Sequence, residues 1–277
     1  MNAPFAAQLK HRHVIRIGGT DRVGFLQGLV SNDVAKVTAT EAVYAALLTP
    51  QGKFLHDMLI LADGDSFLID CERPEDLLKR FAAYKLRARV TLENMSDAYD
   101  VWAIWRGDAR TPLSFNDPRL PDLGQRAFLP KGMAPANTDI ITAEDYDQHR
   151  IAFGVADGSR DLDVEKSTLA EGNFDFLYGI DWKKGCYVGQ ELTARMHYRG
   201  LAKKRLFPVH VEGMPAPGTP LFFKNAESGE MRSHAVDRGL ALLSLDAAQQ
   251  SIEENTPFTC ATGQIRPAKP HWMTQKG

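Results

Sequence analysis

Cys186 is the side chain of this sequence best suited to chemistry. It lies in the segment DWKKGCYVGQELTARMHYRG, residues 181–200, directly after Gly185 and shortly after a pair of lysines. Glycines permit tight backbone turns and the close approach of a ligand. Nearby ammonium groups favour the thiolate form of a cysteine, which is the nucleophile and the metal ligand. We therefore predict that Cys186 is a solvent-reachable thiol with a catalytic role.

The plainer alternative for Cys186 is an inert, buried thiol, because free cysteines are commonly core residues. Cys71 and Cys260 lie in apolar, β-like runs, and we expect both in the core. The three cysteines are far apart and form no CxxC pair, so the sequence predicts neither a disulfide framework nor a zinc ribbon. The eight histidines show no metal-ligand spacing, and we assign no metal site.

The residues that follow Cys186 could recognise a polar ligand. Gln190 and Glu191 offer an amide and a carboxylate, which can hydrogen-bond to a polar heterocycle. Arg195 adds a guanidinium group that suits a ligand carboxylate. The basic run at residues 203–205 is more readily a solvated linker than a binding site.

The patterns along the chain predict the elements that position these groups. Five stretches are β-rich, namely residues 14–17, 44–49, 54–61, 67–71 and 101–105. Pro74 followed by two acids is typical of a helix start. Residues 107–138 are rich in Gly, Pro, Asp and Asn, which predicts a loop-heavy connection, and past Gly200 short β-like runs alternate with turn residues. The sequence therefore predicts an α+β region over residues 1–200 and a β-barrel domain over residues 201–277.

The overall composition is that of a globular chain. The 277 residues are 44% hydrophobic and 25% charged, which allows a sizeable core. A formal net charge of −2 argues against wholesale binding of polyanions, since phosphate recognition needs a basic excess, and we expect no direct nucleic-acid binding. No apolar run reaches membrane-spanning length. We therefore expect no membrane partner and a cytoplasmic location.

The segment around Cys186 resembles the signature of a known family. Residues 184–191, KGCYVGQE, match the signature K-G-C-Y-x-G-Q-E of the YgfZ folate-binding family. The likeness continues in five further stretches, residues 25–28, 31–33, 48–53, 193–195 and 198–200. An eight-residue match with an embedded cysteine is far more specific than a lone glycine-rich loop.

This resemblance implies both a fold and a function. The family shares the fold of the aminomethyltransferase of the glycine cleavage system, with subdomains in a ring around a folate and a C-terminal β-barrel. Its members support the assembly or repair of iron–sulfur enzymes, including tRNA-modifying ones. The implied ligand is tetrahydrofolate, and the implied partners are folate and iron–sulfur client proteins. The cofactor-binding residues that we predict on this basis are Asn32, Asp33, Asp57, Arg150, Lys184, Tyr187, Gln190, Glu191 and Arg195.

Several of these residues have plainer roles open to them. Asn32 and Asp33 could cap and terminate a helix. Asp57 could pair with a buried cation instead of a folate. The prediction for Arg150 rests on a short match to the aminomethyltransferase segment whose arginine reaches the folate.

The chain also departs from the aminomethyltransferases. They usually carry an aspartate–phenylalanine pair where this chain has Cys186 and Tyr187, and two adjacent acids where it has His56 and Asp57. A folate-dependent one-carbon transferase, such as an aminomethyltransferase or a demethylase, is therefore the alternative function, and the missing acid pair argues against it. A binding module for RNA or protein that has lost folate is a further alternative, and the net acidity weakens its RNA version.

Overall fold

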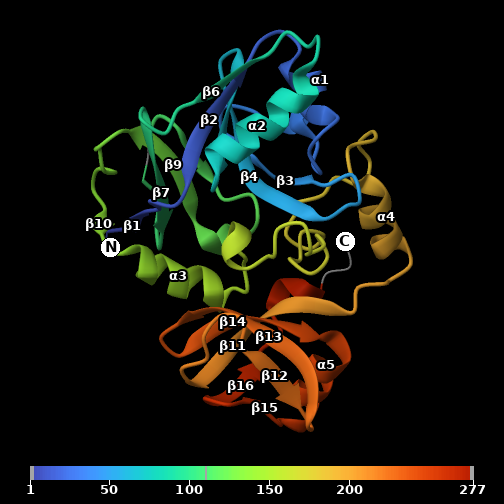
Figure 1. The fold of residues 1–277 in the computed structure, drawn as a ribbon. Helices are drawn as coiled ribbons and strands as arrows, with labels where there is room; N and C mark the ends of the chain where they lie inside the picture. The colour runs from blue at the N-terminus through green and yellow to red at the C-terminus, as the bar shows by residue number, and fades with distance from the viewer. Residues whose placement is uncertain (1–2, 110, 275–277) are drawn as a thin grey trace.

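Two five-stranded sheets and a closed barrel make up this structure, a computed structural model that describes residues 3–109 and 111–274. Figure 1 shows them as three lobes around a central segment, which joins α3 (Ala143–Ala152) to α4 (Gln190–Tyr198). That segment has one short 3-10 helix, η3 (Gly158–Arg160), and otherwise consists of turns and irregular structure. Its course therefore depends on contacts with the lobes around it.

The first sheet has the strand order β3-β4-β5-β2-β6. Its strands are β2 (His13–Gly18), β3 (Val43–Leu48), β4 (Phe54–Asp63), β5 (Ser66–Cys71) and β6 (Thr91–Asn94). The helices α1 (Arg22–Gln27) and α2 (Pro74–Lys85) pack against it (Figure 1). As the sequence predicts, α2 begins at Pro74 with two acids in its first turn, near the positive end of the helix dipole. Leu77 and Phe81 bury its inner face in the core of this lobe.

The second sheet has the order β10-β1-β7-β9-β8. Its strands are β1 (Phe5–Gln8), β7 (Tyr99–Trp105), β8 (Ser114–Asn116), β9 (Gln125–Pro130) and β10 (Asp139–Ile140). β8 and β9 lie within residues 107–138, so the expectation of a loop-heavy connection is wrong for part of this stretch. Arg126 is buried in β9, where it pairs with carboxylates of the interior. A buried arginine interrupts the apolar pattern by which a strand is recognised in a sequence.

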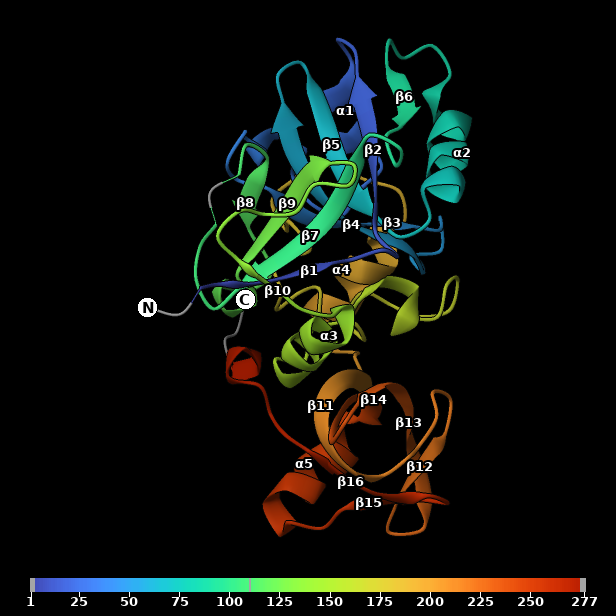
Figure 2. The same ribbon diagram turned by 90° about the vertical axis from the view of Figure 1, so that its left-hand side faces the viewer.

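The helix α3 connects the second sheet to the barrel. It begins with a capping box in which the Thr142 hydroxyl accepts a hydrogen bond from the Asp145 backbone N–H, while the Asp145 side chain accepts one from the backbone of Thr142. It contacts β1 on one side and barrel strands on the other (Figure 2). A further 3-10 helix, η2 (Pro121–Leu123), lies in the same lobe.

The barrel closes in the order β11-β14-β13-β12-β15-β16. Its strands are β11 (Lys204–Gly213), β12 (Pro220–Phe223), β13 (Ala226–Ala235), β14 (Arg238–Ser244), β15 (Phe258–Cys260) and β16 (Gly263–Pro267), with α5 (Leu245–Glu254) between β14 and β15. Phe207, Met231, Leu243 and Phe258 fill its interior. The 3-10 helix η4 (His271–Thr274) follows β16. The expected α+β fold with a C-terminal β-barrel is confirmed.

One core joins all three lobes. It contains Leu61 of the first sheet, Phe128 of the second, Leu240 of the barrel, and Phe174 and Tyr187 of the central segment. Because β1 belongs to the second sheet and β2 to the first, the chain enters both lobes within its first strands. In the described part of the chain, every helix is too short or too polar to cross a bilayer.

Candidate functional site

Cys186 is exposed, and the residues around it are anchored. The side chain of Lys184 donates hydrogen bonds from Nζ to the carbonyl oxygens of Val30, at 2.6 Å, and Asn32, at 2.8 Å. On the other side, Tyr187 is buried in the core that joins the lobes. A Cβ added at Gly185 would meet nothing within 4 Å. The thiol therefore lies in open surroundings on a backbone that is held on both sides.

Two of the signature stretches pack against each other behind Cys186. Gly189 has a φ of +81° and is the residue before α4. A Cβ on it would lie 2.5 Å from the Thr49 carbonyl oxygen, and one on Gly52, whose φ is +79°, would lie 2.8 Å from the Gly189 carbonyl oxygen. The turn at residues 48–53 and the start of α4 can approach this closely only because both carry glycine.

Lys184 turns inward, away from the role expected of it. Burial lowers the pKa of Lys184 to about 8, and the carboxylates of Asp33 and Asp181 oppose that shift. Its ammonium group also lies 5.1 Å from the centre of the Tyr187 ring. Lys184 was expected to favour the thiolate of Cys186. Instead, its ammonium group donates hydrogen bonds to two backbone carbonyls and so holds the segment in place.

Asn32 and Asp33 have the plainer, structural contacts. The Asn32 amide donates to the carbonyl oxygens of Tyr44 and Tyr178, both at 2.7 Å, and so ties the central segment to β3. The Asp33 carboxylate accepts a hydrogen bond from the Ala35 backbone N–H at 3.0 Å, which caps the 3-10 helix η1 (Val34–Lys36). Asp33 thus has the capping role that was its alternative, whereas Asn32 links two segments of the backbone instead of capping a helix.

The predicted residues of α4 divide between its start and its outer face. Gln190 is the first residue of the helix, and its side-chain oxygen accepts a hydrogen bond from the Tyr187 backbone N–H at 3.3 Å. Glu191 and Arg195 are exposed and form an ion pair one turn apart. Both are accessible to a ligand or a partner.

Asp57 lies in a buried cluster of charges around Arg12. The Arg12 guanidinium contacts Asp57 Oδ1 at 2.9 Å, Asp70 Oδ1 at 2.6 Å and Asp157 Oδ1 at 3.4 Å. Burial opposes the charge of Arg12, but these carboxylates raise its pKa well above the usual range. His11 pairs with Asp157 at 2.6 Å. The cation that the sequence left open as a partner for Asp57 is therefore Arg12.

His56 stands beside Asp57 in β4 but pairs elsewhere. Its Nε2 lies 2.7 Å from Asp76 Oδ2 of α2. Burial lowers the pKa of His56 to about 4, although the hydrogen bond to Asp76 opposes the shift. The imidazole is therefore neutral at pH 7. This chain has no pair of free carboxylates at the position where aminomethyltransferases usually carry two acids.

Arg150 is buried at the junction of α3, the central segment and the barrel. Its guanidinium donates to Asp147 Oδ1 at 2.6 Å, to Asp161 Oδ2 at 2.7 Å and to the Val155 carbonyl oxygen at 3.0 Å. Ser233 of the barrel accepts a longer bond at 3.4 Å. With 1% of its surface exposed, Arg150 is engaged entirely within the protein.

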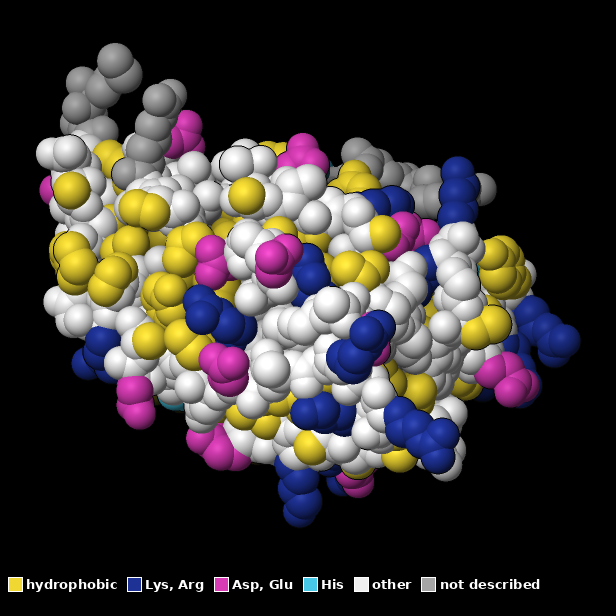
Figure 3. All heavy atoms as spheres, turned by 90° about the horizontal axis from the view of Figure 1, so that it is seen from above, with side chains coloured by type: hydrophobic (Ala, Val, Ile, Leu, Met, Phe, Trp, Pro, Cys, Tyr) yellow, Lys and Arg dark blue, Asp and Glu magenta, His cyan; other side chains and the backbone are white. Residues whose placement is uncertain are grey.

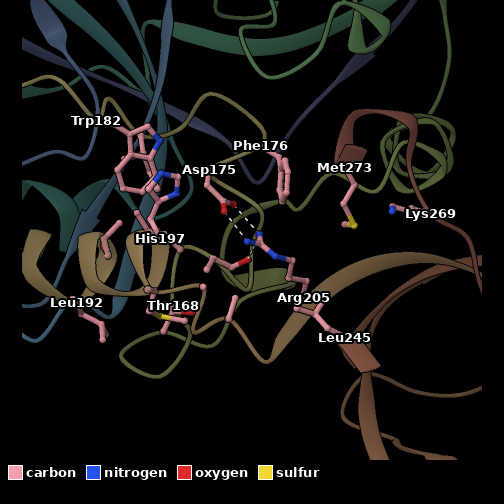
Figure 4. Close-up of a pocket in the computed structure, with 18 residues that line it drawn as sticks. Thr168, Asp175, Phe176, Trp182, Leu192, His197, Arg205, Leu245, Lys269 and Met273 are labelled. Atoms are coloured by element: carbon pink, nitrogen blue, oxygen red, sulfur yellow. Dashed lines mark hydrogen bonds and ion pairs between the residues drawn. The ribbon is translucent and has the colours of Figure 1, made fainter. Parts of the chain in front are cut away.

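A pocket of about 630 Å³ opens between α4, the central segment and the barrel (Figure 4). Trp182 and His197 form a stack on one wall, with ring centres 3.8 Å apart. Phe176 and the Asp175–Arg205 ion pair lie across from them. The sequence analysis did not predict this pocket, because its walls come from segments that are far apart in the chain.

None of the residues predicted to bind a ligand lines this pocket. Asp57 and Arg150 belong to two separate buried clusters, Asn32 and Lys184 meet at the backbone of residues 30–32, and Arg195 is on the outer face of α4. The structure therefore does not bring the predicted set together around one cavity. In the described chain, no three His, Cys, Asp or Glu side chains are grouped so as to hold a metal ion.

Comparison with solved structures defines the class of fold. The aminomethyltransferase T of the glycine cleavage system from Bartonella henselae superposes with a TM-score of 0.77, covering 99% of this chain and 88% of that one. The identity is 12%, so this likeness shows the fold alone. Residues 203–275 match the model of the CAF17 C-terminal beta-barrel domain. The protein thus has an aminomethyltransferase-like fold, and its C-terminal barrel is of the CAF17 type.

Curated relatives define the family. The iron–sulfur cluster assembly factor IBA57 homolog of Mycosarcoma maydis is 35% identical over 238 residues, covering 77% of this chain and 59% of the relative. Human iron–sulfur cluster assembly factor IBA57 is 32% identical, covering 85% of this chain and 76% of the relative, and the mouse protein is 31% identical. This chain belongs to the IBA57 family of iron–sulfur cluster assembly factors.

These relatives confirm the expected kinship of the chain and correct its expected location in the cell. Kinship with iron–sulfur cluster assembly factors on an aminomethyltransferase-like fold is confirmed. The chain spans about three-fifths of the length of the fungal relatives. The expected cytoplasmic location is wrong, because these relatives are all named as mitochondrial proteins. That expectation rested on composition and apolar run length, which do not report a compartment.

Proposed function

We propose that this chain is an accessory protein of iron–sulfur cluster assembly whose functional group is the thiol of Cys186. The exposed position of Cys186 on an anchored backbone is the observation that carries the proposal. Thiolates are the usual protein ligands of iron–sulfur clusters, and a cluster generally takes four of them. One exposed thiol can supply one ligand to a cluster whose other ligands come from a client protein. The clients in this proposal include iron–sulfur enzymes that modify tRNA.

The alternative of a folate-dependent one-carbon transferase has less support. His56 is neutral and bound to Asp76, and Asp57 is paired with Arg12. Neither side chain is free to act as a base on a bound substrate. The accessory role therefore remains the better proposal.

Labelling of the native protein with a maleimide tests the thiol. Cys186 should react at once, because it is exposed, whereas Cys71 is fully buried and burial raises the pKa of its thiol. Cys260 is half-buried, with hydrogen-bond contacts to Thr262 and Gly263, and should react slowly. Mass spectrometry of tryptic peptides gives the three rates. If Cys186 reacts only after unfolding, the proposed role of its thiol is lost.

We also propose that the protein binds a reduced folate, on the strength of the family resemblance and the aminomethyltransferase-like fold. The contacts that the predicted residues make within the protein indicate which of them are free to bind a folate. Gln190, Glu191 and Arg195 are the accessible members, whereas Asp57 and Arg150 are engaged in buried ion pairs. Arg195 is then the guanidinium best placed to take a carboxylate of the glutamate tail.

Calorimetric titration with tetrahydrofolate tests this second proposal. Arg195→Ala should weaken binding by about tenfold or more, the loss of one charge-assisted hydrogen bond, and leave the melting temperature unchanged. Arg150→Ala is the contrasting variant, which should lower the melting temperature because Asp147 and Asp161 lose their buried partner. An absence of saturable heat at millimolar tetrahydrofolate would exclude folate as a ligand.

A further inference from the structure

We propose that the pocket between α4, the central segment and the barrel binds a small planar aromatic molecule that carries an anionic group. The site is separate from the proposed thiol function, because Cys186 does not line it. Its volume of about 630 Å³ is within the range of small-molecule sites, roughly 300–1,000 Å³.

The walls of the pocket present flat aromatic faces. The Trp182 and His197 rings are stacked with an angle of 17° between their planes, and Phe176 lies across the pocket from them (Figure 4). Leu192 and Met196 of α4 add apolar surface. A planar ring can stack against such walls and bury its own apolar area.

Among the charged side chains that line the pocket, the cations outnumber the carboxylates by one. Arg205 binds Asp175 through two hydrogen bonds, of 2.8 and 2.6 Å, and also lies 4.7 Å from the centre of the Phe176 ring. This pair is neutral as a whole. Lys269 also lines the pocket, and within the described parts of the chain it has no carboxylate partner. The pocket therefore carries a net positive charge, which favours an anion.

A hydroxyl group adds a second polar feature. Thr193 lines this pocket from α4 and is 7% exposed, and its hydroxyl interacts with the hydroxyl of the buried Tyr187. A hydroxyl has two acceptor lone pairs besides its single O–H, so Thr193 can still accept a hydrogen bond from a bound molecule.

Two dyes of similar shape test the proposal on the full chain. The anion 8-anilinonaphthalene-1-sulfonate should bind at one saturable site, with energy transfer from tryptophan, and should raise the melting temperature of the native protein. N-phenyl-1-naphthylamine, which lacks the sulfonate, should bind about fivefold more weakly. Lys269→Gln should remove that difference. Lys204→Gln, which deletes an exposed charge of β11 outside the pocket, should preserve it.

A blocking variant guards against binding elsewhere. Ala202 lines the pocket and is half-buried, so Ala202→Phe should fill the cavity and abolish binding of both dyes while the circular dichroism spectrum is unchanged. Binding that does not saturate, or that survives Ala202→Phe, overturns the proposal. Cys186→Ala should bind both dyes as the wild type does, so a failure here leaves the proposed thiol function standing.

Discussion

Replacing Cys186 by alanine is expected to abolish the support of iron–sulfur enzymes while leaving the fold intact. The thiol is exposed, and the hydrogen bonds that anchor its segment come from Lys184 and not from the cysteine. Loss of an exposed thiol of this kind should change stability by well under about 1 kcal/mol. The function, in contrast, should fall to the level of cells without the protein. The measurement is the activity of an iron–sulfur enzyme in such cells, together with the melting temperature of the purified variant.

The control for this prediction is the half-buried Cys260. Cys260→Ala removes a thiol from β15, far along the chain from the signature segment, and should leave activity unchanged. Cys186→Ser tests whether shape is sufficient, since serine has nearly the same size but is a poor iron ligand. Full activity of either the alanine or the serine variant at position 186 would contradict the proposed role of the thiol.

Replacing Arg12 by methionine is expected to cause the largest loss of stability. The change removes the buried cation that contacts Asp57, Asp70 and Asp157, so buried Asp57 loses its ion pair and the other two carboxylates lose one of their cations. Breaking a buried ion pair from one side costs about 3–5 kcal/mol. A domain is typically stable by only about 5–15 kcal/mol, so the variant should be close to unfolding. The shift of the urea midpoint measures the effect.

A matched variant separates this effect from the general loss of an arginine. Arg89→Met removes an ion pair with Asp21 that is largely exposed, and should leave the urea midpoint within error of the wild type. Arg12→Lys retains the charge but not the forked guanidinium, and should fall between the two. Equal midpoints for Arg12→Met and Arg89→Met would show that the buried cluster is not important for stability.

The net charge of the chain does not reveal the buried ion pairs on which these predictions depend. Figure 3 shows acidic and basic side chains interspersed over the face seen from above. The net charge of −2 says nothing about where the charges lie. Arg12 and Arg150 are conspicuous only in the folded protein, where each is buried among carboxylates from distant parts of the chain.

Much of the fold could be predicted from local patterns. The start of α2 follows from Pro74 and the acids after it, since these residues act within one turn of helix. The barrel follows from short β-like runs separated by turn residues. In contrast, β9 was missed because Arg126 has the wrong polarity for a buried strand position. Only the carboxylates of Asp70 in β5 and Asp117 just after β8 make that position acceptable.

The candidate site likewise has some features that the sequence predicts and others that arise only on folding. The motif around Cys186 could be recognised from the sequence, because it consists of consecutive residues whose types and order are distinctive. Three features arise only when the chain folds. The turn at residues 48–53 packs against the start of α4, Lys184 binds the carbonyls of residues 30 and 32, and Trp182 and His197 form one wall of a pocket. Contacts of this kind join residues far apart in the chain, and their geometry arises only when the three lobes pack together.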